Sequence, residues 1–91
     1  MTSSTAAPNQ DQVAAVIREL LGHELKITPA EIGDDAVLKE LPGADSVRLV
    51  RVVSRLERHW DTEFEDDQVF GLRTFDELVT LTLANLTDGN G

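Results

Sequence analysis

Apolar residues recur at steps of three and four along three stretches of the chain, and this spacing places them on one face of an α-helix. The first stretch follows Asn9 and contains Val13, Val16, Ile17, Leu20, Leu21 and Leu25. The second runs from about Ser46 and contains Val47, Val50, Val53, Leu56 and Trp60, widened by Leu49 and Val52. The third follows Thr74 and contains Phe75, Leu78, Val79, Leu81, Leu83 and Leu86. No segment shows the sustained alternation of a β-strand, so we predict three substantial helices.

The residues that begin two of these stretches are typical of helix N-termini. Asn9 is followed three residues later by Gln12, and Thr74 is followed three residues later by Glu77. Each pair can form a capping box, in which each side chain accepts a hydrogen bond from the other residue's backbone N–H. Between the second and third stretches, an acidic run is flanked by the apolar residues Phe64, Val69 and Phe70. This pattern predicts a short helix or turn.

The segment from Lys26 to Asp45 contains too many helix breakers for a long regular element. Within it, Thr28-Pro29-Ala30-Glu31 predicts one short capped turn with proline at its first position. We expect five apolar residues to anchor this loop on the core, namely Ile27, Ile32, Val37, Leu38 and Leu41. Loops of this length in small domains are uncommon unless they are functional.

These elements predict an all-α fold, a four-helix bundle of three major helices and one short helix. A long ordered loop would join the first two helices. A bundle is the simplest arrangement that buries three apolar stripes against one another. We expect the bundle to span residues 9–87, preceded by a disordered tail at residues 1–8 and followed by a disordered end at residues 88–91.

Charge and composition exclude several classes of function. The 91 residues carry 17 acidic and 8 basic side chains, a formal charge of −9, which disfavours binding to nucleic acid. There is no cysteine, so the polypeptide has no disulfide, thiolate metal ligand or thiol nucleophile of its own. No apolar run is long enough to cross a membrane, and the N-terminus lacks the pattern of a signal peptide. We therefore expect a cytoplasmic protein that does not associate with membranes.

Conventional catalytic and metal-binding patterns are scarce. His23 and His59 are the only histidines, and neither stands at a spacing from a serine that suggests a catalytic triad. The acids from Asp61 to Asp67 superficially resemble a calcium loop, but the sixth position is Asp66, where that loop requires glycine. We therefore predict no catalytic residue and no metal site, with the histidines and these acids on solvated faces.

One segment stands out, Leu41-Pro42-Gly43-Ala44-Asp45-Ser46-Val47, where the breaker-rich loop passes directly into a predicted helix. This position places the Ser46 hydroxyl at the positive end of the helix. Free backbone N–H groups and the helix dipole favour a negative group there, including a phosphate diester on that serine. Asp and Ser are also common helix caps, so the segment alone does not separate a modified serine from a cap.

The whole pattern resembles the acyl and peptidyl carrier proteins, which are small acidic four-helix bundles. In that family an Asp-Ser-Leu-type motif opens the second helix, as Asp45-Ser46-Val47 does here, and Leu56-Glu57 stands near its end. The acidic stretch with Val69 and Phe70, and the final helix that begins at Thr74, follow the family's order of elements. The resemblance covers roughly residues 10–87.

The resemblance implies that Ser46 carries a 4′-phosphopantetheine arm, transferred from coenzyme A by a phosphopantetheinyl transferase. Asp45 would help to present Ser46 to the transferase and its magnesium; otherwise it is a plain cap. Val47 stands where the family usually has leucine or methionine, and so offers a smaller apolar contact to a partner or the core. The protein would then be a non-catalytic carrier that holds acyl or aminoacyl groups as thioesters and delivers them to enzymes, raising their effective concentration there.

The second helix departs from carriers of fatty-acid synthesis, whose second helix is typically acidic. Here its polar face carries four arginines, Arg48, Arg51, Arg55 and Arg58. We therefore expect partners with acidic or mixed docking patches, contacted by Val47, Arg48, Arg51 and Arg55, as in dedicated polyketide or nonribosomal-peptide pathways. The alternative is that the arginines are solubilising residues, some of them paired with Glu57 or neighbouring acids.

The expected partners are the transferase, an acyl- or aminoacyl-loading enzyme, and downstream synthase or transferase enzymes. We expect a monomeric, stand-alone carrier of a specialised biosynthetic pathway. The runner-up function, from a different class, is a helical adaptor without a prosthetic group that binds another protein through its apolar and arginine faces. The sequence leaves the cargo open, because the arm is common to all cargoes.

Overall fold

The computed structural model describes residues 9–88. Its elements, in chain order, are α1 (Gln10–Leu25), the 3-10 turns η2 (Pro29–Glu31) and η3 (Leu38–Glu40), α2 (Ser46–Trp60), α3 (Asp66–Phe70) and α4 (Phe75–Asp88). This described part of the chain contains one isolated β-bridge and no strand. The predicted all-α fold, with three major helices, one short helix and a long loop after the first, is confirmed.

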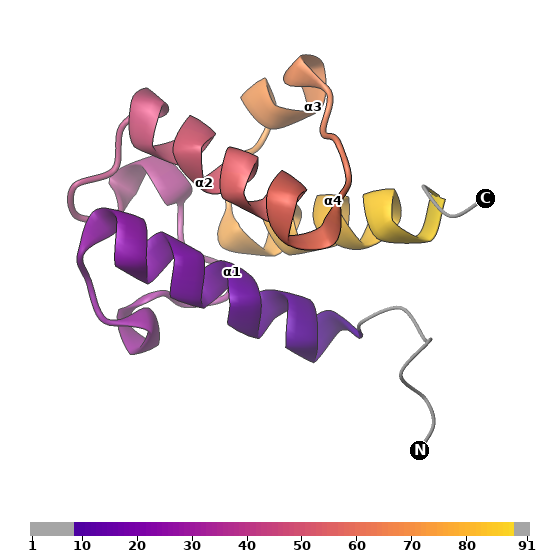
Figure 1. Ribbon diagram of the computed structural model, residues 1–91. Coiled ribbons are helices and arrows are strands. Elements are labelled where there is room, and N and C mark those ends of the chain that lie inside the picture. Colours follow the sequence, from indigo (N-terminus) through magenta and orange to yellow (C-terminus); the bar gives the residue numbers. More distant parts are fainter. Residues whose placement is uncertain (1–8, 89–91) are drawn as a thin grey trace.

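Helix α1 packs against both α2 and α4, while α3 lies beyond α2 on the side away from α1 (Figure 1). The core between the three long helices is mainly aliphatic, as the apolar stripes predict. Its most deeply buried members are Val13, Ile17 and Leu21 of α1, Val52 and Leu56 of α2, and Phe75, Leu78 and Val79 of α4. The bundle therefore forms because α2 and α4 each bury an apolar stripe against α1.

The described residues end close to the predicted limits of the bundle. Helix α4 extends through Asp88, one residue beyond the predicted end of the bundle at residue 87. Such a difference is within the usual uncertainty of helix ends. The ranges 1–8 and 89–91, which we expect to be disordered, lie outside the described residues.

The predicted capping boxes are confirmed. At the start of α1, the side chains of Asn9 and Gln12 each accept a hydrogen bond from the other residue's backbone N–H, at 2.8 and 2.9 Å. At the start of α4, Thr74 Oγ1 accepts from the backbone of Glu77 at 3.2 Å, and a Glu77 carboxylate oxygen accepts from the Thr74 backbone at 3.3 Å. These local bonds fix where both helices begin.

The predicted core face of α2 is partly wrong. Val52, Val53 and Leu56 are buried as expected, but the side chains of Val47 and Val50 are 63% and 47% exposed. Leu49 and Trp60 are partly buried against the core. The helix has apolar residues over more than half of its circumference near its N-terminus, and its neighbours cover only one side of that surface. Two valines near Ser46 are therefore left at the surface.

The loop between α1 and α2 is held by side chains and by backbone bonds. Three predicted anchors are buried and Ile27 is partly buried; the buried ones are Ile32, Leu38 and Leu41. The prediction for Val37 is wrong, because its side chain is 37% exposed. Val37 instead forms the isolated bridge with Thr74, flanked by hydrogen bonds of 2.8 Å from Leu38 N to Arg73 O and from Phe75 N to Ala36 O. The bridge ties the loop to the start of α4.

Candidate functional site

A tight turn delivers the chain into α2. The backbone N–H of Ala44 donates to Leu41 O at 3.0 Å, and Gly43 between them has φ +79°. Proline at the second position and a glycine of positive φ at the third are the signature of a type II turn. A side chain at Gly43 would be strained in this conformation, so the glycine is what permits the turn.

Asp45 is the N-cap of α2, which is the role that the sequence offered as the alternative to transferase recognition. Its Oδ1 accepts a hydrogen bond from the Arg48 backbone N–H at 2.8 Å, and its backbone is extended, with φ −152° and ψ 174°. The Arg48 side chain returns toward it, with Nε 3.9 Å from Asp45 Oδ2. The cap satisfies a backbone donor that the helix itself cannot.

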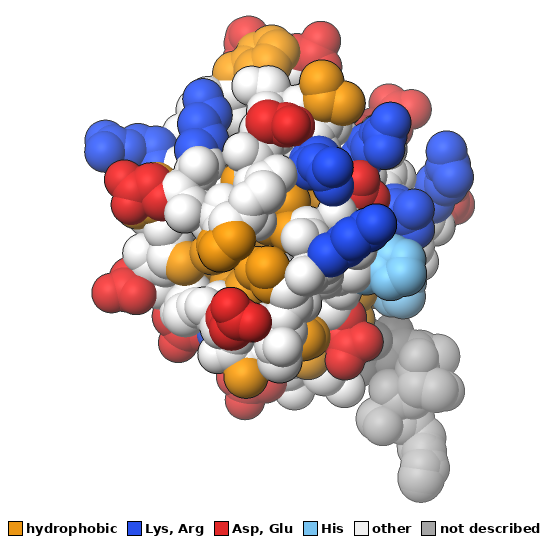
Figure 2. All heavy atoms as spheres, turned by 90° about the vertical axis from the view of Figure 1, so that its left-hand side faces the viewer, with side chains coloured by type: hydrophobic (Ala, Val, Ile, Leu, Met, Phe, Trp, Pro, Cys, Tyr) orange, Lys and Arg blue, Asp and Glu red, His pale blue; other side chains and the backbone are white. Residues whose placement is uncertain are grey.

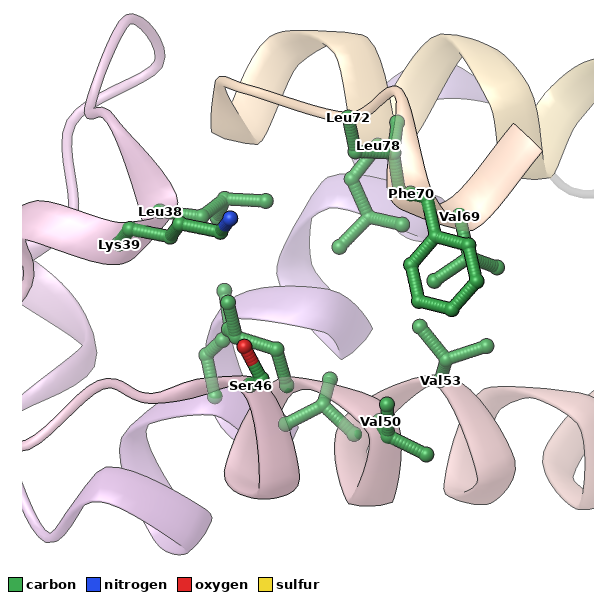
Figure 3. A pocket seen from close by; sticks show the side chains of 12 residues that line it. Leu38, Lys39, Ser46, Val50, Val53, Val69, Phe70, Leu72 and Leu78 are labelled. Atoms are coloured by element: carbon green, nitrogen blue, oxygen red, sulfur yellow. The ribbon is translucent and has the colours of Figure 1, made fainter. Parts of the chain in front are cut away.

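Ser46 is the first residue of α2 and its side chain is exposed. Because Asp45 fills the capping position, the Ser46 hydroxyl takes part in no hydrogen bond within residues 9–88. Figure 3 shows its oxygen facing the gap between the start of α2 and η3. A serine at a helix start commonly acts as the N-cap, with its hydroxyl oxygen accepting a hydrogen bond from a backbone N–H. Here the hydroxyl is free and reachable from solvent.

A small apolar pocket of about 70 Å³ opens beside Ser46. Its walls come from α2, η3, α3 and the start of α4 (Figure 3), and Leu21 of α1 also lines it. Of its twelve lining residues only Ser46 and Lys39 are polar; the others are Leu21, Leu38, Leu49, Val50, Val52, Val53, Val69, Phe70, Leu72 and Leu78. Neither the pocket nor Lys39 could be recognised from the sequence, because the pocket forms where residues from five elements meet.

Exposed hydrophobic side chains surround this site. Phe70, at the end of α3, is 77% exposed, and Val47 and Val50 of α2 are also at the surface. Figure 2 views the molecule from the end at which α2 begins, and shows hydrophobic surface at the centre and top of that face. Large apolar groups exposed together are typical of surfaces that contact another molecule. The sequence placed Phe70 only near a short helix, without indicating that it faces solvent.

Two arginines of α2 pair with one buried carboxylate. The Glu24 side chain, 8% exposed, lies 3.5 Å from Arg51 Nη1 and 3.6 Å from Arg55 Nε. The backbone oxygen of Glu24 also accepts a hydrogen bond of 3.0 Å from Arg48 Nη1. Some arginines of α2 therefore pair with an acid, as the alternative in the sequence expects, but the acid is Glu24 of α1. The Glu57 carboxylate instead accepts a hydrogen bond from the backbone of Phe64.

These contacts hold the basic face of α2 in place without removing it from solvent. The side chains of Arg48, Arg51 and Arg55 remain 41%, 65% and 49% exposed. Figure 2 shows a group of Lys and Arg side chains on the right-hand side of the face that holds the start of α2, and a further group at its upper left. A partner that approaches Ser46 from this side meets a basic edge whose charge is partly offset by Glu24.

The residues considered for other chemistry lie apart from Ser46. His23 and His59 are exposed, and the His59 ring lies edge-on against Trp60 at 4.7 Å between centroids. Within residues 9–88 no group of three or more His, Cys, Asp or Glu side chains is placed to hold a metal ion. None of the described helices is long and apolar enough to cross a membrane.

Comparison with known proteins identifies the family. The model of the phosphopantetheine attachment site matches residues 15–82. An acyl carrier protein of Sulfurovum sp. is 32% identical over 63 residues, which are 69% of this chain and 84% of that protein. One from Saccharopolyspora erythraea is 36% identical over 67 residues, covering 74% and 70%, and one from Cyanophora paradoxa is 24% identical over 86 residues, covering 92% and 84%.

The chain therefore belongs to the acyl carrier protein family, and its prosthetic group is a covalently bound 4′-phosphopantetheine. The predicted family and cofactor are confirmed. Of the predicted site residues, Asp45, Ser46 and Val47 lie together at the start of α2, and Arg48, Arg51 and Arg55 follow along one side of the helix. The free Ser46 hydroxyl fits the attachment of such a group, because nothing else in the described structure uses it.

Proposed function

We propose that Ser46 is the residue to which the phosphopantetheine arm is attached. The observation that carries this proposal is the exposed hydroxyl at the first position of α2, released from a capping role by Asp45. In the loading reaction the Ser46 oxygen forms a bond to phosphorus in the pyrophosphate of coenzyme A. The pyrophosphate P–O bond breaks, the phosphorylated adenosine leaves, and the serine proton passes to a base of the transferase.

Asp45 is proposed as a recognition residue for the transferase. Its side chain is 60% exposed, and the two hydrogen-bond acceptors of a carboxylate leave capacity beyond the single cap bond. The carboxylate of the residue next to Ser46 can therefore contact a magnesium ion held by the transferase while it still caps α2. This second role would make Asp45 unlike an ordinary cap.

Once loaded, the protein acts as a carrier and its partners supply the chemistry. We propose that it operates in the cytoplasm and delivers acyl or aminoacyl thioesters to loading and synthase enzymes. The flexible arm would raise the effective concentration of the thioester at each partner's active site to roughly millimolar. This role requires no acid, base or metal from the carrier itself.

The surface around Ser46 supports a specialised set of partners. Val47 offers an exposed apolar contact, and Arg48, Arg51 and Arg55 border it along α2. Acidic or mixed patches on partners would be attracted to these arginines, whereas strongly basic patches would be repelled by them. On this ground we place the carrier in a polyketide or nonribosomal-peptide type of secondary-metabolite pathway.

The experiment measures modification at Ser46 directly. The protein is coexpressed with a broad-specificity phosphopantetheinyl transferase and weighed intact by mass spectrometry. Ser54→Ala, which removes a partly buried serine from the same helix, is the matched control for Ser46→Ala. We expect one phosphopantetheinyl group on the wild type and on Ser54→Ala, and none on Ser46→Ala. Modification that persists in Ser46→Ala would refute the assignment.

The adaptor function is tested by the same variants. It is favoured by the exposed Val47, Val50 and Phe70, which could bind a protein without any arm. An adaptor predicts partner binding that survives Ser46→Ala and weakens on charge reversal at Arg48, Arg51 or Arg55. An unmodified wild-type protein that still binds its partner in this way would favour the adaptor over the carrier.

A further inference from the structure

Attachment at Ser46 would place an anion in an unfavourable setting. The chain has a formal charge of −9, and the carboxylate of Asp45 stands directly beside the proposed attachment point. A phosphodiester adds one more negative charge there. The N-terminal N–H groups of α2 offset part of this repulsion, but Asp45 already occupies one of them by accepting from Arg48 N. A nearby cation would therefore attract the phosphodiester and favour the direction of the arm that brings the two together.

Most cations around α2 are already engaged. Arg48 donates to Glu24 O and lies near Asp45, while Arg51 and Arg55 share the Glu24 carboxylate. Lys39, by contrast, forms no hydrogen bond or ion pair through its side chain within residues 9–88. It is also the only cationic side chain among the residues that line the pocket with Ser46.

The fold holds Lys39 in this position. Its neighbour Leu38 is 3% exposed, and the Leu38 backbone donates to Arg73 O at 2.8 Å, so η3 is fixed to the start of α4. Figure 3 shows the Lys39 nitrogen and the Ser46 oxygen facing the same gap between η3 and α2. A lysine can lay its methylene stem along an apolar wall while its ammonium group stays in water. The backbone of η3 thus places this exposed side chain on the side of the pocket across from Ser46.

We propose that Lys39 is a positioning residue for the prosthetic group, whose ammonium group binds the phosphodiester on Ser46 and directs the first part of the arm across the pocket mouth. This inference rests on the proposed attachment at Ser46 and adds a residue from outside the Asp-Ser motif. Lys39 takes no part in forming or breaking a bond. It selects, among the directions open to a flexible arm, the one in which the diester faces η3.

The test follows the diester by ³¹P NMR in the holo protein, with the arm thiol alkylated by iodoacetamide so that no cargo is present. Loading is followed by mass to completion before each measurement, so a slow transferase reaction does not affect the comparison. Lys39→Met removes the charge and keeps an apolar stem, whereas Lys39→Arg keeps the charge. Arg58→Met is the matched control, because it also removes one positive charge but at a distant position. Arg58 lies in α2 twelve residues beyond Ser46, about 18 Å along the helix axis.

We expect the wild-type ³¹P resonance to move with added NaCl toward its position in Lys39→Met, and the resonance of that variant to stay nearly constant. The screening length falls from about 10 Å at 0.1 M to about 3 Å at 1 M salt, so an exposed ion pair is lost over this range. We expect the population in which the diester faces η3 to fall about two- to five-fold in Lys39→Met, as for the loss of an exposed ion pair. Lys39→Arg and Arg58→Met should behave as the wild type. The ¹⁵Nζ resonance of Lys39 should also shift between the apo and holo forms.

The outcomes separate this inference from the proposed function. Modification of Ser46→Ala would overturn the attachment site, and with it this inference. A holo protein loaded at Ser46 whose ³¹P resonance has the same salt dependence in Lys39→Met as in the wild type would overturn only the role of Lys39. Equal loss of the salt dependence in Arg58→Met would show a general effect of net charge and would also overturn it. Circular dichroism melting of each variant confirms that the comparison is made on folded protein.

Discussion

Replacing Asp45 by alanine should separate its two proposed roles. The substitution removes the hydrogen bond of 2.8 Å from Arg48 N to Asp45 Oδ1, which caps α2. It also removes the contact of 3.9 Å between Asp45 Oδ2 and Arg48 Nε, whose side chains are 60% and 41% exposed. Asparagine at the same position can still accept the cap bond but carries no charge. Comparing the two variants therefore distinguishes the acceptor from the charge.

The expected loss in Asp45→Ala is about 1 kcal/mol, mostly from the cap, since an exposed ion pair contributes between about 0 and 1 kcal/mol. For a chain of this size that loss lowers the melting temperature by about 4 to 8 °C. Asp45→Asn should lose less than half as much, because asparagine and aspartate are similar caps. Thermal melts followed by circular dichroism measure both changes under the same buffer and salt.

The transferase provides the second readout for the same pair of variants. If the carboxylate also contacts the transferase or its magnesium, both variants should be loaded more slowly, although only Asp45→Ala is clearly less stable. Normal loading of Asp45→Asn would refute the recognition role and leave Asp45 as a cap. An Asp45→Asn protein as unstable as Asp45→Ala would refute the capping argument. Ser46→Ala should melt like the wild type, because Ser46 does not cap α2.

Three further predictions concern the remaining surface and core. Glu24→Gln should lower the free energy of unfolding by about 1 to 2 kcal/mol, a loss limited by the exposure of Arg51 and Arg55. A double-mutant cycle with Arg55→Gln should show coupling between the two sites, and additive losses would contradict the pairing. Phe70→Ala should change the free energy of unfolding by less than about 0.5 kcal/mol, whereas Leu56→Ala, which truncates a fully buried side chain, should lower it by about 2 to 5 kcal/mol. Similar losses for both variants in urea unfolding would show that Phe70 is not a surface residue. Raising NaCl from low to moderate concentration, or adding magnesium, should raise the melting temperature because it screens a net charge of −9, and an unchanged melt would show that the acids are compensated locally.

The helix boundaries could be predicted because their causes are local. The caps at Asn9 and Thr74 involve residues three positions apart, so the sequence contains both partners of each hydrogen bond side by side. The same holds for the turn at Thr28, where Glu31 accepts from the backbone at 3.1 Å. Short-range bonds of this kind form with little dependence on how the helices later pack.

The side that each helix buries was harder to predict. Periodicity placed Val47 and Val50 on the core face of α2, yet both are exposed, while the polar residues Glu24 and Thr82 are buried. Thr82 tolerates burial because its hydroxyl donates to Leu78 O at 2.8 Å within α4. Which part of a wide apolar surface is covered depends on the position of the neighbouring helices, and periodicity carries no information about that position.

The sequence by itself determined the order and limits of the helices, the turn at Gly43 and the placement of Ser46 directly after the Asp45 cap. Each of these depends on residues within four positions of one another. Only the tertiary structure decided that Glu24 pairs with Arg51 and Arg55, that Phe70 faces solvent, and that Lys39 shares a pocket with Ser46. These features join residues from different elements, and they exist only after burial of the core has brought α1, η3 and α3 against the rest of the bundle.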